Sequence, residues 1–469
     1  MINSTNLNYL IYFLFIGIWS SIGSDPYNFL ILFENKNYLY LNIAKINVKE
    51  IINFLRAIFP LCSLIICLFI LIKYKLYNNQ KSFIYILLLI QLIQIVATFI
   101  SKNSIMSNFE NIIDHIGRYH WIISSIASIL LFMIAFKLKN FDMKKLFYIS
   151  VFFLALMISI FSTKNTIDFY SMDIRTSLYN INVLREGAYF LDHQMPRVTG
   201  ISRSIIFLYV IVFILNYDLK NNSKYLNYIF YIILSLLGSF LIIYQSKYAL
   251  GAFIIVNIIF FYNFKNKFKG AKIILILFIS QLLIFYIYSN SRIIINKIDS
   301  KFFTINEKED LYKEENRIKH FRKFGNVGLE GMDYADHAIF SGRISLWKES
   351  IKYIKSRPFL GYGSMSDRAI INKQRLKDNY LVNPVSSAFF YAILSGGFFS
   401  LMLFLYFWLN IKKKIFNNFK IQDIASSENK IGSILILLIG LRCLIENSIM
   451  LFGVDYLLLL NSLYLTEKK

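Results

Sequence analysis

Isolated basic side chains in a very apolar chain have the chemistry to bind phosphate. Arg343 begins a patterned segment, and Arg197 and Arg203 lie close together in MPRVTGISR. A guanidinium group presents a planar fork of donors that meets phosphate oxygens bidentately and keeps its charge at neutral pH. Several such groups together predict a clamp for a diphosphate, whereas each one alone can equally well extend to a lipid phosphate at the membrane surface. The candidate cations are Arg197, Arg203, Lys247 in YQSKYALG, Arg292 and Arg343.

A cationic clamp can stabilise a departing diphosphate as its negative charge grows. Electrostatic stabilisation of this kind contributes about 3 kcal/mol per well-placed donor, so several donors together can replace a divalent metal. Metal-ligand spacing is absent from the sequence, since His115 and His120 are five residues apart and the other histidines are isolated. Nucleotide-binding and nucleophile-elbow motifs are absent as well. We therefore predict a reaction without metal or cofactor, driven by an activated substrate.

Removal of a proton from an acceptor hydroxyl would need a base, and two residues are catalytic candidates beside Arg343. His337 lies in a hydrophilic stretch with acidic neighbours, and Glu446 lies in an apolar run in GLRCLIENS. Both have a plainer interpretation. A single loop histidine is often a packing residue, and Glu446 near Arg442 can form a structural ion pair, as can Asp455.

The elements that must position these groups are membrane spans. The 469 residues are 56% hydrophobic, with a mean hydropathy of +0.51. Apolar runs long enough to cross a bilayer recur along the chain and predict an all-α polytopic membrane protein with about twelve transmembrane helices. The first run has no basic flank or cleavage site and predicts a retained span. The predicted spans are 8–23, 52–72, 83–100, 119–136, 146–162, 201–217, 226–244, 248–263, 273–289, 385–410, 431–447 and 450–466.

Lysine clusters predict the orientation of these spans. The net charge of +23 is concentrated in alternate short loops, around residues 73–81, 137–145, 265–272 and 412–420. Such loops are typically cytoplasmic and contact membrane lipids, so the charge does not indicate nucleic acid. Both termini are then cytoplasmic. The chain divides into spans at 1–289 with a smaller external loop at 162–200, a large external loop at 290–384, and C-terminal spans at 385–469.

The large external loop contains the most informative segment, SGRISLWKESIKYIKSRPFLGYG at 341–363. Its spacing predicts an interfacial helix that begins at Arg343, followed by a turn. The apolar face of that helix is predicted to hold Ile344, Trp347, Ile351 and Ile354. Pro358, Gly361 and Gly363 are expected to shape the turn, while Trp347 packs the helix or contacts a sugar.

Three elements resemble the superfamily of O-antigen ligases and Wzy-type O-antigen polymerases. PRVTGISRS is similar to its Arg-x-x-Gly element, QSKYALGAF to its Ser-Arg-Gly-Ala element, and 341–363 to its loop signature of Gly-Arg, Trp and Pro-x-x-Gly-x-Gly. The resemblance covers roughly 190 to 410. It implies a fold like that of C-type glycosyltransferases, with one large, partly helical periplasmic loop and the active site at the periplasmic face of the bacterial inner membrane.

Departures from the family pattern separate the possible activities. Lys247 stands where the family usually has Arg, which keeps the charge but loses the fork. Ligases of the family have a His-Asn pair before the span that follows the loop, whereas this chain reads LVNPVSSAFF with Asn383 and no His. The pattern therefore favours a polymerase that acts on undecaprenyl-diphosphate-linked oligosaccharide. A ligase that transfers glycan to lipid A-core, and a flippase or transporter of the same glycan, stay open as alternatives.

The resemblance also implies partners. A chain-length regulator and a flippase are expected to work beside a polymerase of this kind. The sugar, the linkage and the stereochemistry do not follow from the sequence, because they depend on the geometry of the loops.

Overall fold

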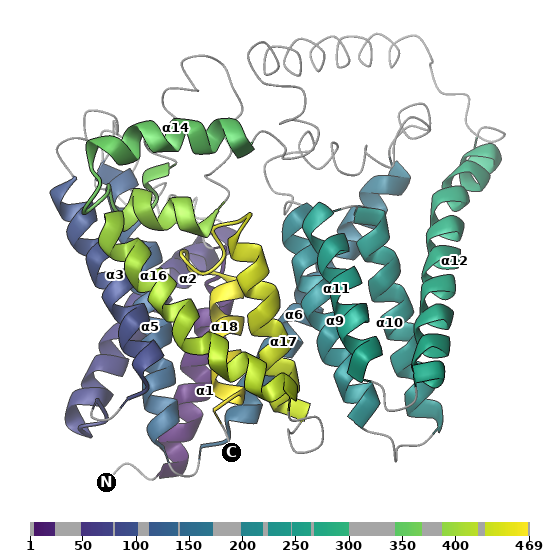
Figure 1. Ribbon diagram of the computed structural model, residues 1–469, viewed down its shortest axis with the longest axis horizontal. Coiled ribbons are helices and arrows are strands. Elements are labelled where there is room, and N and C mark those ends of the chain that lie inside the picture. Colours follow the sequence, from purple (N-terminus) through teal and green to yellow (C-terminus); the bar gives the residue numbers. More distant parts are fainter. Residues whose placement is uncertain are drawn as a thin grey trace. The chain divides into compact units, whose positions relative to one another are not determined.

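The structure is a computed structural model in which twelve stretches of the chain are described. Within them the protein is helical and contains no strand (Figure 1). This agrees with the predicted class of an all-α polytopic membrane protein. The described residues are 4–23, 48–77, 80–101, 112–138, 141–171, 198–218, 224–244, 246–263, 267–299, 343–367, 387–420 and 427–467.

A helix is present at each predicted span, because an apolar segment in lipid must satisfy its backbone donors and acceptors internally. Within the described stretches, seven helical segments are long and apolar enough to cross a membrane, and three apolar helices are shorter. The number of twelve spans itself stays a prediction. The seven segments are Ile51–Lys73, Ser82–Ile100, Gly117–Lys137, Met143–Thr163, Tyr225–Tyr244, Gly270–Tyr288 and Ala388–Lys412; the shorter three are Ile201–Asn216, Tyr248–Tyr262 and Val454–Leu465.

The chain forms two compact units, each built from separate stretches of sequence. The first contains residues 1–146, 311–416 and 439–461. In it, α5 packs against α1, α2 and α3. Its helices are α1 (Ser4–Ser20), α2 (Val48–Lys73), α3 (Ser82–Ile100), α5 (Ile112–Lys137), α14 (Arg343–Ser356) and most of α16 (Ala388–Lys420), together with parts of α17 (Ser427–Cys443) and α18 (Val454–Leu465).

The second unit contains residues 147–310, 417–438 and 462–469. In it, α10 packs against α9 and α12, and α11 packs against the same two helices. Stacked rings of Phe213 and Phe260, with centroids 3.9 Å apart, join α9 to α11. The helices are most of α6 (Met143–Ser171), α9 (Val198–Asp218), α10 (Lys224–Tyr244), α11 (Lys247–Asn263) and α12 (Lys267–Asp299), together with most of α17 and the last residues of α16 and α18.

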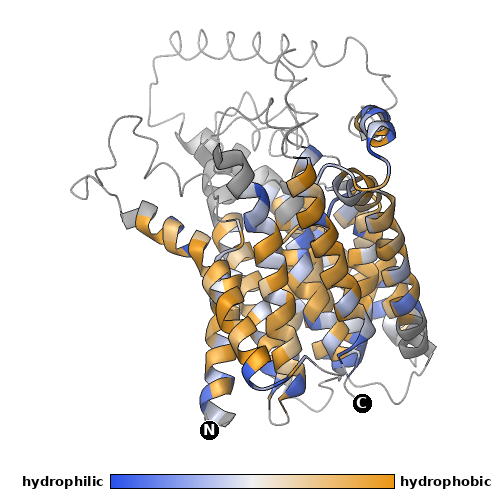
Figure 2. Ribbon diagram, turned by 90° about the vertical axis from the view of Figure 1, so that its left-hand side faces the viewer, coloured by the Kyte–Doolittle hydropathy of each residue, from blue (hydrophilic) through white to orange (hydrophobic). Residues whose placement is uncertain are grey.

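The two faces of the helices differ in chemistry. Figure 2 shows that the long helices are apolar along most of their length. On α12 the apolar side chains of Leu275, Phe278 and Leu283 are exposed, as expected where lipid is the solvent. In contrast, α3 buries the polar side chains of Gln91 and Gln94 against protein. Polar groups in membrane helices characteristically face the interior in this way.

Helix α16 is kinked near its beginning, where Gly397 has φ +65° and ψ −162°. Only glycine adopts this backbone conformation easily. The kink makes backbone groups of α16 accessible to another segment, and the loop after α14 uses them.

Candidate active site

Helix α14 begins at Arg343, as predicted, and packs one face on α16 within the first unit. The indole of Trp347 stacks on the ring of Phe390, with centroids 5.3 Å apart and 15° between the planes. Leu346 and Leu394 lie beside them in one buried cluster. Protein covers only part of the predicted apolar face, because Ile351 is 41% exposed. The buried side of α14 is centred on Leu346 and Ser350. It is rotated around the helix axis from the side that the spacing of the isoleucines predicts, because α14 packs on α16.

The turn after α14 is fixed to the kink of α16 by backbone hydrogen bonds. The amide of Tyr362 donates to the carbonyl oxygen of Leu394 at 2.8 Å, and the amide of Gly363 donates to that of Ser395 at 2.7 Å. In return, the amide of Phe398 donates to the carbonyl oxygen of Pro358 at 2.7 Å. The turn and the kink therefore satisfy each other's backbone groups.

Both predicted glycines of the turn need to be glycine. Gly361 has φ +61° and Gly363 has φ +86°. A Cβ on Gly361 would lie 2.6 Å from the carbonyl oxygen of Leu394, and one on Gly363 would lie 2.4 Å from Cα of Thr98. This geometry favours glycine at both positions, and the carbonyl oxygen of Pro358 accepts one of the hydrogen bonds of the turn. The role of Pro358, Gly361 and Gly363 in shaping a site stays a prediction.

A buried arginine that the sequence analysis did not select holds the same turn. Arg118 of α5 is 2% exposed. Its Nε donates to the carbonyl oxygen of Ser364 at 2.7 Å, and its Nη2 donates to that of Tyr362. The hydroxyl of Ser101 also donates to the carbonyl oxygen of Tyr362, at 2.6 Å. Helices α3 and α5 therefore both bind the backbone of the turn.

Polar groups continue beyond the turn into a buried network of the first unit. Asp367 is 1% exposed, and its Oδ2 accepts from Nδ2 of Asn447 at 3.5 Å. The Oδ1 of Asn447 accepts from the amide of Ser387 at 3.1 Å. This network links the end of the described loop, the start of α16 and the connection between α17 and α18.

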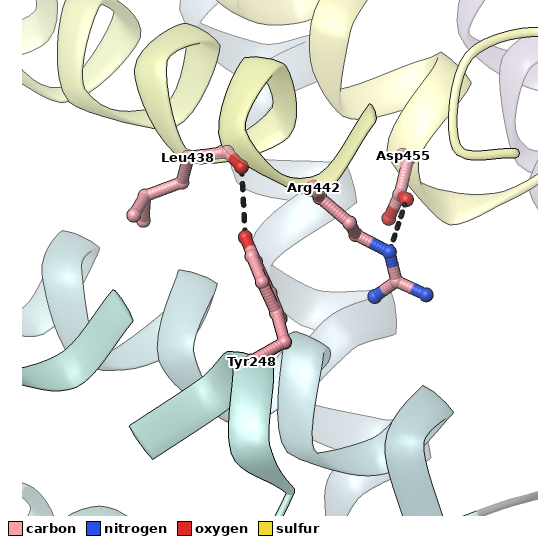
Figure 3. Close-up of polar contacts among 4 residues, drawn as sticks. All are labelled: Tyr248, Leu438, Arg442 and Asp455. Atoms are coloured by element: carbon pink, nitrogen blue, oxygen red, sulfur yellow. Dashed lines mark hydrogen bonds and ion pairs between the residues drawn. The ribbon is translucent and has the colours of Figure 1, made fainter. Parts of the chain in front are cut away.

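Arg442, for which the sequence suggested Glu446 as a structural partner, forms an ion pair with Asp455. Nε of Arg442 lies 3.1 Å from Oδ2 of Asp455, and both side chains are buried (Figure 3). Glu446, predicted within a span, instead lies after α17 has ended at Cys443. It is half-buried in the connection to α18, and its amide donates to the carbonyl oxygen of Arg442, which closes the last turn. Its catalytic role stays a prediction.

The other predicted cations belong to the second unit or lie outside the description. Arg203 is half-buried in the second turn of α9, Lys247 is the first residue of α11, and Arg292 lies in α12, which continues well beyond the predicted span end. Arg197 and His337 lie outside the described residues. A diphosphate clamp formed by all these residues therefore stays a prediction.

The surroundings of α14 change the pKa of one of its tyrosines, Tyr353. The pKa of Tyr353 is raised from its ordinary value, first by burial and then by the nearby Glu349 and Tyr362. Tyr353 therefore stays a neutral hydrogen-bonding group at physiological pH. The hydroxyl of the neighbouring Tyr362 lies 2.6 Å from Oγ of Ser356, at the end of α14.

Together these features define a multi-pass helical membrane protein whose one described loop helix is docked by a glycine turn onto membrane helices. Residues 230–405 match the family model described as O-antigen ligase, and this match supports the superfamily of O-antigen ligases and polymerases. Enzymes of this family are glycosyltransferase-like. The predicted family resemblance is thus confirmed. No curated protein and no solved structure matches the chain.

Two features of the site were missed although the sequence carried a signal for one of them. Arg118 in IGRYHW stands at the end of a predicted span, which is the criterion that selected Arg203 and Arg292. Asp367 had no such signal, because it lies in the hydrophilic loop, where a single carboxylate is unremarkable. Only the fold shows that it is buried.

Proposed function

We propose that this protein is a surface-polysaccharide polymerase, a glycosyltransferase that transfers a growing glycan from undecaprenyl diphosphate to a lipid-linked repeat unit. The reaction takes place at the periplasmic face of the bacterial inner membrane and needs no metal. Both substrates are amphiphiles with their sugars outside the bilayer. A site at the boundary between membrane helices and an external loop suits such substrates.

The transfer exchanges one bond to the anomeric carbon for another. An acceptor hydroxyl oxygen forms a bond to that carbon while the bond to the diphosphate oxygen breaks, and the diphosphate leaves with the electron pair. The acceptor proton passes to a base, for which His337 and Glu446 are the candidates. Arg197, Arg203, Lys247, Arg292 and Arg343 would stabilise the leaving diphosphate. Holding two lipid-linked substrates side by side supplies effective concentration.

The observation that carries this proposal is the docked segment 343–363 inside the matched region. The family match includes this segment, Lys247 and the kink of α16. In Figure 1, α14 lies across the ends of α3 and α16, where the turn binds both helices. Arg343 is the first residue of that helix. This supports a cation held at the membrane boundary.

Sequence around Asn383 favours polymerase over ligase. The family's ligases carry a His-Asn pair before the span that follows the loop, and this chain has no histidine there. Ligase stays the second candidate, because the matching family model is itself described as O-antigen ligase.

The first experiment compares surface polysaccharide from cells that lack the gene with cells in which it is restored. For a polymerase, we expect the ladder to collapse to core carrying a single repeat unit. Loss of every repeat from the core, with lipid-linked polymer accumulating, would instead identify a ligase. An unchanged ladder would exclude both activities on this polysaccharide.

A second experiment tests the site with purified protein and a lipid-diphosphate repeat unit in nanodiscs, without added metal. We expect Arg343→Ala to reduce polymer formation at least tenfold. Lys352→Ala is the matched control, because Lys352 is an exposed cation on the same helix. Equal effects of the two substitutions would show that only the general charge of α14 matters.

A further inference from the structure

We propose that Arg118 is a positioning residue for the transfer reaction, which fastens the glycine turn and thereby sets the place of Arg343. The inference rests on the proposed function. Arg118 would touch neither substrate, because it is 2% exposed and its guanidinium faces backbone oxygens of the turn.

The contacts of Arg118 are unusual for a membrane arginine. Nε binds the carbonyl oxygen of Ser364, and Nη2 binds that of Tyr362 and lies 3.4 Å from Oγ of Ser101. A buried charge in a membrane protein is costly and commonly marks function. Here one planar guanidinium group binds the carbonyl oxygens of Tyr362 and Ser364, which are separated by a single residue. The single ammonium group of a lysine does not have this paired donor geometry.

Arg118 is also the central member of a larger attachment. On the α3 side, the amide of Ser364 donates to Oγ1 of Thr98 at 3.0 Å. On the α16 side, the amide of Met365 donates to the Tyr391 hydroxyl at 2.8 Å. The turn is thus bound to α3, α5 and α16. Arg118 is the charged group among these contacts, and charge-assisted hydrogen bonds are the stronger kind.

A fixed turn controls the far end of α14 because the helix is stiff. The 14 residues from Arg343 to Ser356 span about 20 Å. A tilt of about 10° at the turn would therefore move the first residue by about 3 Å. A misplacement of about 1 Å can reduce a reaction rate by about 100-fold. Small losses of order at the turn are then sufficient to remove Arg343 from its working position.

The test measures docking of the turn without any substrate. Ser364 is 1% exposed, so a cysteine there reports undocking through its reaction with a membrane-impermeant maleimide. The reporter Ser364→Cys is placed in full-length protein in nanodiscs after the three native cysteines, Cys62, Cys67 and Cys443, are replaced by serine. We expect the rate of labelling to rise at least tenfold with Arg118→Met. Arg118→Lys should give an intermediate rate, because it keeps the charge but loses the fork.

Two controls separate positioning from general loosening. Arg56 of α2 also binds two backbone carbonyls, those of Ser20 at 2.6 Å and Ile22 at 2.9 Å, but at the end of α1. Arg56→Met should leave labelling at position 364 unchanged. A second reporter, Ser128→Cys in the interior of α5, should stay protected in the Arg118 variants, because Ser128 is 1% exposed among packed helices.

Polymer formation is measured on the same proteins. We expect at least a tenfold loss with Arg118→Met and partial recovery with Arg118→Lys. Unchanged labelling in both Arg118 variants would overturn the proposal, and so would increased labelling with normal polymer formation. If Arg118→Met does not accumulate in membranes, Arg118→Lys alone decides by the same criteria. Failure of the unsubstituted protein to make polymer would overturn the proposed function, and the labelling would still report whether Arg118 holds the turn.

Discussion

Gly363 and Thr98 approach so closely that no side chain fits between them. A Cβ on Gly363 would lie 2.4 Å from Cα of Thr98 and 2.2 Å from its Oγ1. The same Oγ1 accepts a hydrogen bond from the amide of Ser364 at 3.0 Å. The close contact and the hydrogen bond need each other, because the turn can reach the α3 hydroxyl only with glycine at position 363.

Substitution Gly363→Ala is therefore expected to undock the turn. The positive φ of Gly363 alone adds strain of about 1–3 kcal/mol with any other residue, and the backbone of α3 cannot move aside. We expect a lower thermal midpoint in detergent and loss of polymer formation. Gly453→Ala is the matched control, because a Cβ there meets nothing within 4 Å. Equal midpoints for the two variants would contradict the docking of the turn.

The stacked pair of Trp347 and Phe390 predicts a measurable coupling. Their rings lie 5.3 Å apart and nearly parallel. Aromatic pairs of this kind contribute about 0.5–1.5 kcal/mol beyond the apolar area that they bury. A double-mutant cycle with Trp347→Ala and Phe390→Ala, read from unfolding free energies, should give a coupling in this range. A coupling near zero, with additive single effects, would mean that α14 does not rest on α16 through this pair.

The helix that carries Trp347 could be predicted from the sequence, but the side that it buries could not. The spacing of Trp347 with Ile344, Ile351 and Ile354 indicates a helix, and α14 does begin at Arg343. Which stripe is buried depends on the surface beneath it. Trp347 stacks on Phe390 of α16, whereas Ile351 is 41% exposed. Periodicity predicts the helix, whereas packing on a distant segment decides its rotation.

In the site, too, local features could be predicted from the sequence, whereas contacts between distant segments could not. Pro358, Gly361 and Gly363 could be assigned to a turn because their conformational preferences are local. Arg118 and Asp367 belong to contacts between residues about 250 positions apart or to networks across several segments. No local pattern encodes such contacts. Glu446 was placed in a span because its surroundings are apolar, yet the helix ends at Cys443.

A hydrogen bond in the second unit offers a small and specific test of that unit. The hydroxyl of Tyr248, at the start of α11, donates to the carbonyl oxygen of Leu438 at 2.8 Å (Figure 3). Tyr248→Phe removes only the hydroxyl, so we expect a loss of about 0.5–1.5 kcal/mol in unfolding free energy. Tyr228→Phe is the control, because Tyr228 of the same unit is 65% exposed. A loss as large in the control would show that the Tyr248 bond contributes nothing particular.

The buried pair of Arg442 and Asp455 predicts opposite effects for single and double substitution. Breaking such a pair leaves an uncompensated buried charge and costs about 3–5 kcal/mol, whereas replacing both groups by apolar residues is often neutral. We expect Arg442→Met and Asp455→Leu each to lower the thermal midpoint strongly, and the double variant to recover most of the loss.

If the double variant regains its stability, its activity tests whether the two charges take part in function. A charge pair that served transport would be needed for activity even when stability returned. We expect the recovered double variant to keep its polymer ladder, because the pair joins the end of α17 to the start of α18 by a 3.1 Å contact between buried atoms. A stable double variant without any polymer would assign these two charges a direct part in handling the lipid-linked glycan.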